Sequence, residues 1–171
     1  MNNQKNVLCF SGHRSERLPQ NIEDYKDMIE KLNEEINKAL KYGADTFFFG
    51  ACYGFDLLCA QIVLHNKKIV DIKNPKTIKL IAVVPYEEQA KYWSEADREI
   101  YYRTLAECDD VITLNTRYKK RCYYERSRYM VDRSSKMICY YDGRKGVMEY
   151  TYTYAEKNKL QITNICKKDA L

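Results

Sequence analysis

Three polar segments of the chain carry side chains that can bind an anion or a sugar, and each directly follows an apolar run. The first is Ser11-Gly12-His13-Arg14, after the run at 6–10. A glycine lets the backbone turn sharply after a strand, and an arginine offers a rigid fork of donors for phosphate or carboxylate. We therefore predict ligand contacts from these four residues. The alternative is a loop arginine paired with a surface acid.

The second segment, at 50–56, joins a short apolar run to the start of a predicted helix. Its glycines and small residues predict a phosphate cradle, because backbone N–H groups at a helix N-terminus point toward an anion. The segment has neither the Gly-x-Gly-x-x-Gly spacing nor the lysine of a P-loop. Asp56 either caps the helix or grips a ribose hydroxyl. The predicted contacts here are Gly50, Ala51, Tyr53, Gly54 and Asp56.

The third segment runs from Arg126 to Glu149. Arg126, Tyr129 and Arg133 share one helix face by their spacing of three and four residues. Asp-Gly-Arg-Lys-Gly follows the next apolar run, and Glu149 enters the helix after it. The alternative for these charges is a solvated helix face, which contributes little to stability. The predicted contacts here are Arg126, Asp132, Asp142, Gly143 and Gly146.

The elements that must position these segments alternate along the chain. Apolar runs predict strands at 6–10, 46–49, 78–84, 111–114, 137–141 and 161–165, and apolar periodicity predicts helices at 22–40, 55–67, 87–107, 123–134 and up to about 158. The polar stretch at 66–76, which contains Pro75, is predicted as a loop. This alternation predicts an α/β fold, one Rossmann-like three-layer α/β/α domain over 1–171 with a mostly parallel central sheet. Ligands of such sheets bind at the carboxyl ends of the strands.

Composition narrows the class of protein. The chain has 171 residues, of which 45% are hydrophobic and 31% charged, as in one globular domain. These values exclude a membrane span, a coiled-coil rod and a repeat array. The net charge of +5 is weak for a nucleic-acid-binding protein.

The cysteines indicate packing rather than metal binding. There are seven, with no Cys-x-x-Cys pair and only two histidines, so we predict no metal site. Cys9 and Cys139 lie within apolar runs and are expected to be small buried hydrophobes. Residues 1–6 are polar and lack the apolar core of a signal peptide, which favours a reducing, cytoplasmic compartment. We expect no cofactor.

Together with Pro85-Tyr86-x-x-Gln89, the three segments resemble the YpsA-like branch of the SLOG superfamily, which is named for the Smf/DprA DNA-processing proteins and the LOG phosphoribohydrolases. The resemblance covers about 7–155. It implies a Rossmann-like fold that binds a nucleotide or a derivative such as an ADP-ribose-like molecule, and it adds Pro85 and Tyr86 to the ligand contacts. The implied role is sensing or regulation.

The sequence departs from the family pattern at two places. Ser127 stands where the family typically has asparagine, and Val147 and Met148 stand where it usually has glycine and threonine. A side chain at Val147 occupies space that the backbone would use to approach a phosphate. This argues against phosphate binding at the loop, unless Arg144 and Lys145 compensate.

Two other functions follow from the same resemblance. In a LOG-like phosphoribohydrolase, Arg126 would hold the phosphate while Glu149 acts at the anomeric carbon of a nucleoside monophosphate. DNA binding, as in the DNA-processing relatives, ranks last because the net charge is only +5. We therefore expect a nucleotide-like small molecule as the partner, with neither a nucleic acid nor a membrane.

Tyrosine is unusually frequent, with 16 copies against five phenylalanines and one tryptophan. Tyrosine supplies a flat apolar ring with one hydroxyl, which suits base stacking and interfaces. Tyr53 and Tyr86 follow predicted strands and are the candidates for stacking on a base. The tyrosines of the second half predict ordinary packing or a homo-oligomer, a dimer or higher.

Overall fold

The apolar runs form six strands of one parallel sheet in the computed structural model, which describes residues 6–73 and 78–167. Neighbouring strands follow the order β4-β3-β2-β1-β5-β6, and every neighbouring pair is parallel. The predicted Rossmann-like α/β fold is therefore confirmed. The strands are β1 (Val7–Gly12), β2 (Thr46–Phe49), β3 (Lys79–Val84), β4 (Asp110–Thr113), β5 (Lys136–Tyr140) and β6 (Gln161–Asn164).

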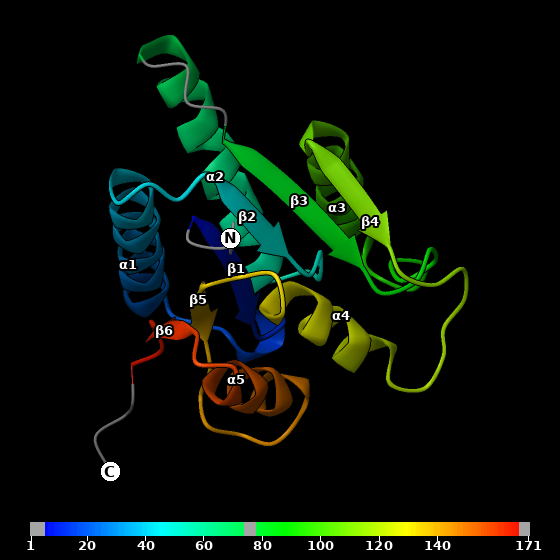
Figure 1. Ribbon diagram of the computed structural model, residues 1–171. Coiled ribbons are helices and arrows are strands. Elements are labelled where there is room, and N and C mark those ends of the chain that lie inside the picture. Colours follow the sequence, from blue (N-terminus) through cyan, green and yellow to red (C-terminus); the bar gives the residue numbers. More distant parts are fainter. Residues whose placement is uncertain (1–5, 74–77, 168–171) are drawn as a thin grey trace.

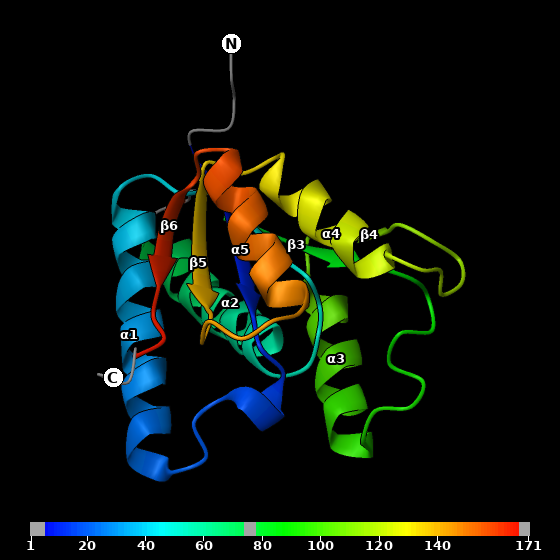
Figure 2. The same ribbon diagram turned by 90° about the horizontal axis from the view of Figure 1, so that it is seen from below.

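Helices cover both faces of the sheet (Figures 1 and 2). The helices α1 (Ile22–Lys41), α2 (Phe55–Lys73) and α3 (Glu95–Glu107) lie on one face, and α4 (Cys122–Val131) and α5 (Val147–Lys157) on the other; a short 3-10 helix, η1 (Ser15–Arg17), follows β1. Successive side chains of a strand point to opposite faces. Leu8 and Phe10 of β1 thus join the core under α1 and α2, while Cys9 joins the core under α4 and α5.

The core confirms the prediction for the two cysteines within apolar runs. Cys9 and Cys139 are 1% and 0% exposed. Burial raises the pKa of the Cys9 thiol to about 12, so this thiol is protonated and packs as a small apolar side chain.

Two helices differ from the prediction in their ends. α2 continues to Lys73, so residues 68–73 are helical and not a loop, while residues 74–77 lie outside the described part. Proline is common just after the end of a helix because it cannot continue the helix, so a proline at position 75 is compatible with a helix that reaches Lys73. α3 begins at Glu95 and not at 87, because the Ser94 side chain accepts a hydrogen bond from the Asp97 N–H at 3.1 Å and caps the helix there.

Ser127 joins the two helices of the second face. Its hydroxyl lies 2.7 Å from the Thr151 hydroxyl, and both residues are 1% exposed. Each hydroxyl also lies within hydrogen-bond distance of a carbonyl of its own helix, at Tyr123 and Val147. Because each hydroxyl carries one proton, one of them donates to its carbonyl and the other donates to its partner hydroxyl. The serine that replaces the family's asparagine thus anchors α4 on α5 and fixes the rotation of α4, which carries Arg126.

None of the helices in the described part of the chain combines the length and the apolar character that a membrane span requires.

Removing the contact between Ser127 and Thr151 should loosen α4 from α5. We expect Ser127→Ala and Thr151→Val each to lower the free energy of unfolding by about 1 kcal/mol, because each loses one buried hydrogen bond while the surviving hydroxyl keeps its own carbonyl partner. The double variant should cost less than the sum of the two. Urea unfolding measures all three, with Thr153→Val on the exposed side of α5 as the control. Strictly additive costs would show that the two hydroxyls do not act together.

Candidate functional site

The parallel strands deliver the predicted segments to one edge of the sheet, which the arrowheads in Figure 1 mark. β1 ends at Gly12, β2 at Phe49, β3 at Val84 and β5 at Tyr140, and all four run in the same direction. The segments that begin at this carboxyl edge are 11–14, 50–56, 85–89 and 142–146.

A buried carboxylate and a buried guanidinium meet against Gly50. Asp56 is 4% exposed and Arg126 is 7% exposed. Arg126 Nη1 donates to the Gly50 carbonyl at 3.0 Å. A Cβ at Gly50 would lie 2.7 Å from Asp56 Oδ2 and 2.9 Å from Arg126 Nε, so only glycine fits between the two side chains.

This pair is electrostatically unusual. Burial raises the pKa of Asp56 to about 6, although Arg126 and the N–H groups of Cys52 and Gly12 act to lower it. Asp56 Oδ1 and Arg126 Nε are both buried and have no hydrogen-bond partner among the described residues. Buried polar atoms in folded proteins are nearly always paired. Two open atoms on neighbouring charged groups, with a perturbed pKa, are therefore the features of a functional site.

The two glycine-containing loops interlock behind this pair. The Phe55 N–H donates to the His13 carbonyl at 3.1 Å. A Cβ at Gly12 would overlap the Phe55 ring, and a Cβ at Gly54, whose φ is +93°, would lie 2.5 Å from the Ser15 nitrogen. Both glycines are therefore required for the close approach of segments 11–14 and 50–56.

Gln89 holds the second loop in place, a role that the sequence did not reveal. It is 5% exposed, and its Nε2 donates to the Ala51 carbonyl at 3.1 Å. Ala51 has a φ of 55°, which is unfavourable for a residue with a side chain. Gln89 thus supports the conformation that brings Gly50 to Asp56. The only sequence signal was its place in the Pro-Tyr-x-x-Gln motif.

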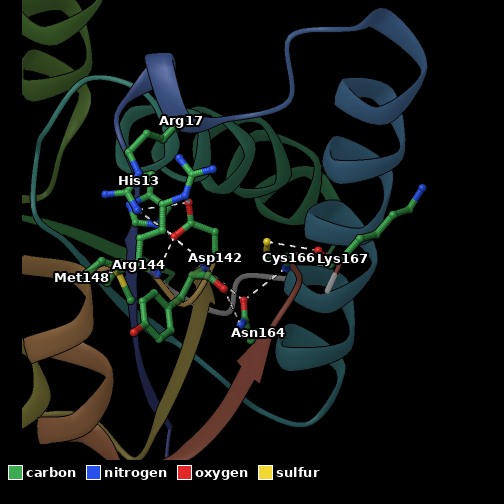
Figure 3. A network of polar contacts seen from close by, with 10 residues as sticks. His13, Arg17, Asp142, Arg144, Met148, Asn164, Cys166 and Lys167 are labelled. Carbon is green, nitrogen blue, oxygen red and sulfur yellow. Dashed lines mark hydrogen bonds and ion pairs between the residues drawn. The ribbon is translucent and has the colours of Figure 1, made fainter. Parts of the chain in front are cut away.

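Asp142 clamps the loop after β5 onto the loop after β1, as Figure 3 shows. Its Oδ1 lies 2.8 Å from His13 Nε2 and 2.8 Å from Arg17 Nη2, and it accepts from the Arg144 N–H at 3.0 Å. Burial acts to raise the pKa of Asp142, but these donors outweigh it and the pKa is lowered. Burial lowers the pKa of His13 despite Asp142. His13 and Asp142 are thus engaged with each other.

The glycines of the loop before α5 have free space around them, whereas Met148, in the first turn of α5, is buried. A Cβ at Gly143 or Gly146 would meet no atom within 4 Å. Met148 is 5% exposed, and its sulfur accepts a hydrogen bond from the Ser11 hydroxyl at 3.2 Å. Met148, which replaces the family's threonine, therefore accepts the hydrogen bond of Ser11, so the Ser11 hydroxyl already has a partner within the protein.

Two predicted residues have other contacts. Glu149 is half-buried in the first turn of α5 and acts on the pKa of Tyr141, which is raised chiefly by burial. Asp132 follows the last residue of α4 and accepts from the Tyr154 hydroxyl at 2.8 Å. It lies six residues after Arg126, which corresponds to a rise of about 9 Å along a helix toward the opposite edge.

Tyrosine rings border the carboxyl edge. Tyr53 donates from its hydroxyl to Glu16 at 2.8 Å, and the Arg14 guanidinium lies 5.2 Å from its ring centre. Tyr86 lies 6.2 Å from Tyr123 between ring centres, and the Arg126 guanidinium lies 5.4 Å from the Tyr123 ring. Tyr53 and Tyr86 thus stand at the edge beside cations, and Tyr123 is a member of this border that the sequence did not single out.

Comparison with known proteins gives consistent likenesses. The family model described as the YspA SLOG family (YpsA) matches residues 8–169. The UPF0398 protein YpsA of Bacillus subtilis (strain 168) is 30% identical over 161 residues, which cover 91% of this chain and 87% of that protein. The SPbeta prophage-derived protein YoqJ of the same strain is 29% identical over 146 residues, 78% of this chain and 80% of that protein.

One solved structure shares the fold. It is that of DNA processing protein A from Helicobacter pylori, a protein described as having a single-stranded DNA binding mode. The TM-score is 0.59 at 14% sequence identity, and the match covers 91% of this chain and 63% of that one. The chain thus spans less than two thirds of the protein whose fold it shares.

The raised pKa of Asp56 predicts that this carboxylate destabilises the fold. A carboxyl whose folded pKa lies above its unfolded value binds more protons when folded, so stability falls as pH rises from about 4 to about 6. The neutral variant Asp56→Asn should therefore have a higher free energy of unfolding than the wild type at pH 7.5, by roughly 3 kcal/mol at most. At pH 4 the two free energies should be equal, and urea unfolding measures both. Asp45→Asn, before β2, is the control. A less stable Asp56→Asn at pH 7.5 would show that attraction to Arg126 outweighs burial.

Proposed function

The chain belongs to the YspA SLOG family, and on this premise we propose that it binds a nucleotide or a nucleotide-derived molecule, such as an ADP-ribose-like one, at the carboxyl edge of its sheet. The proposed role is sensing or regulation in the cytoplasm. The observation that carries the proposal is the pair of buried, unpartnered atoms, Asp56 Oδ1 and Arg126 Nε, beside Gly50. A ligand with hydroxyls and an anionic group satisfies both.

The chemistry of a nucleotide matches the groups at this edge. A ribose hydroxyl donates to a carboxylate such as Asp56, and a phosphate accepts from arginines such as Arg126 and the exposed Arg14. Gly50 lets both side chains approach the backbone closely because it carries no side chain of its own. Tyr53 and Tyr86 offer rings for the base.

The geometry favours binding over hydrolysis. The phosphoribohydrolase alternative assigns Arg126 to the phosphate and Glu149 to the anomeric carbon. Arg126 contacts Gly50, after β2, while Glu149 acts on Tyr141, after β5, and β1 lies between these two strands. A hydrolase would need both side chains on one nucleotide, so the different contacts of the two residues support the binding role.

The ligand class is tested by calorimetry with AMP, ADP, ADP-ribose and ribose 5-phosphate. We expect at least one of them to bind, and Arg14→Ala to weaken that binding about tenfold or more, because a charged hydrogen bond contributes about 1.5–3 kcal/mol. Arg14 is exposed, so this variant keeps the fold. Arg103→Ala, an exposed arginine of α3, is the matched control and should bind as the wild type does.

No binding of any of these molecules, or equal binding by both arginine variants, would overturn the proposal. The same samples decide between binding and hydrolysis, since free adenine from AMP is detected by chromatography. We expect none. Release of adenine that is lost in Glu149→Ala would establish the phosphoribohydrolase instead.

The proposal includes a homo-oligomer formed through the tyrosine-rich second half. The rings of Tyr124 and Tyr150 lie 4.4 Å apart, and Tyr150 and Tyr154 are stacked at 5.9 Å. These half-buried rings join α4 to α5 and leave part of each ring at the surface. Light scattering at high concentration is expected to give a mass above 20.3 kDa. A monomer at every concentration would exclude this interface.

A further inference from the structure

The segment between β4 and α4 concentrates positive charge at the surface. Residues 116–121 read Thr-Arg-Tyr-Lys-Lys-Arg, and all six are exposed. Lys119 pairs with Glu125 at 2.9 Å. Within the described part of the chain, no ion pair is found for Arg117, Lys120 or Arg121. We call residues 116–121 the basic segment.

An exposed tyrosine stands in the middle of the basic segment and joins two others. Tyr118 is 63% exposed. Its ring centre lies 5.5 Å from that of Tyr86 and 6.5 Å from that of Tyr123, and the hydroxyls of Tyr86 and Tyr123 are 3.4 Å apart. We call Tyr86, Tyr118 and Tyr123 the tyrosine cluster.

The basic segment is held against the carboxyl edge by specific contacts. The side-chain amide of Asn115 donates to the Pro85 carbonyl at 2.9 Å and to Glu125 at 3.2 Å. The backbone carbonyl of Asn115 accepts from the Glu87 N–H at 3.1 Å. Figure 1 shows this loop extending from the body of the protein beside α4. Its base is therefore anchored on the segment after β3, while its charges face solvent.

The tyrosine cluster is continuous with the buried pair. The Arg126 guanidinium lies 5.4 Å from the Tyr123 ring centre, and Arg14 is among the groups that act on Tyr86, whose pKa is raised chiefly by burial. Cations and rings therefore follow one another from Gly50 outward, first Arg126 and Arg14, then the tyrosine cluster, then the basic segment.

We propose that the basic segment and the tyrosine cluster bind single-stranded nucleic acid, with bases stacked on Tyr118 and Tyr86 and phosphates at Arg117, Lys120 and Arg121. The proposal deepens the nucleotide-binding function above and rests on it for the unit nearest Gly50. Exposed rings next to free cations are what a single strand recognises, because every base has a face to stack and every linkage carries one negative charge. A duplex hides its base faces, so the rings select an unpaired strand.

Nearby acids do not cancel this charge. Glu125 forms an ion pair with Lys119 and accepts a hydrogen bond from Asn115. Glu88 pairs with Lys91 at 3.7 Å. Glu87 is the other acid of segment 85–89, and one carboxylate does not balance the three cations of the basic segment for which no ion pair is found in the described part of the chain. A net positive surface therefore remains.

The test is fluorescence anisotropy with labelled oligothymidine and oligouridine about twenty nucleotides long, with the matching duplex as a further probe. We expect both single strands to bind more tightly than the duplex and than thymidine monophosphate. Tyr118→Ala should weaken binding about tenfold, as loss of one stacked base predicts, and Tyr118→Phe should bind within about twofold of wild type because it keeps the ring.

Charge is tested separately. Arg117→Glu with Lys120→Glu should weaken binding about tenfold or more at 0.1 M salt and should make the slope of log affinity against log salt shallower by about 1.4, or about 0.7 for each lost phosphate contact. Lys38→Glu with Lys41→Glu makes the same change in net charge in the last turns of α1, at the opposite edge, and should leave both values unchanged.

Equal weakening by the two charge-reversed variants would reduce the effect to general polyanion attraction and overturn the proposal. The same conclusion follows if Tyr118→Ala binds like wild type, or if heparin binds as tightly as the single strands with the same dependence on Arg117 and Lys120. The outcome is separable from that of the proposed function. Loss of mononucleotide binding in Arg14→Ala concerns the buried pair, whereas length-dependent binding lost in the Tyr118 and basic-segment variants concerns this surface alone.

Discussion

The structure of the carboxyl edge depends on one constraint, the burial of Asp56 and Arg126 on either side of Gly50. Two charged side chains can be removed from water only where their neighbours leave space and supply polar contacts. Gly50 leaves the space, since any Cβ there would touch both groups, and its carbonyl accepts from Arg126. The high pKa of Asp56 shows that burial is only partly compensated. The fold therefore loses stability at Asp56, which is also where the proposed ligand would supply the missing polar contacts.

The same constraint extends through α4 to the other face of the sheet. Arg126 and Ser127 are adjacent on this helix, so the rotation that aims Arg126 at Gly50 also turns Ser127 onto Thr151 of α5. α5 in turn places Met148 against the Ser11 hydroxyl at the end of β1. The departures from the family pattern at Ser127 and Met148 are therefore linked, because both serve the contact of α5 with the rest of the edge.

The sequence predicts the parts of this structure that depend on local patterns, and it does not indicate contacts between residues far apart in the chain. The strands, their parallel arrangement and the segments at the carboxyl edge were predicted because apolar runs and glycines are local signals. The clamp between His13 and Asp142 joins residues 129 positions apart, and no local pattern indicates it. The sequence does not indicate where α2 ends, because a polar stretch is typical of a loop as well as of an exposed helix end, and nothing before Asn74 breaks the helix. Asp132 follows the last residue of α4, and the rise of the helix between it and Arg126 is not visible as a local pattern in the sequence.

The charge of the molecule shows why a net charge is a poor guide to the binding properties of one surface. A net charge of +5 suggests a weak attraction to polyanions. Exposed charges more than about 10 Å apart are largely screened at 0.1 M salt, so a ligand at the carboxyl edge responds to the local density and not to the sum. Four cations fall within residues 117–121, and the acids that balance the total lie mostly on other elements, such as the outer side of α1. Since Tyr118 stands among these cations, the surface combines attraction for phosphate with a ring for a base, which neither the total charge nor the tyrosine count reveals by itself.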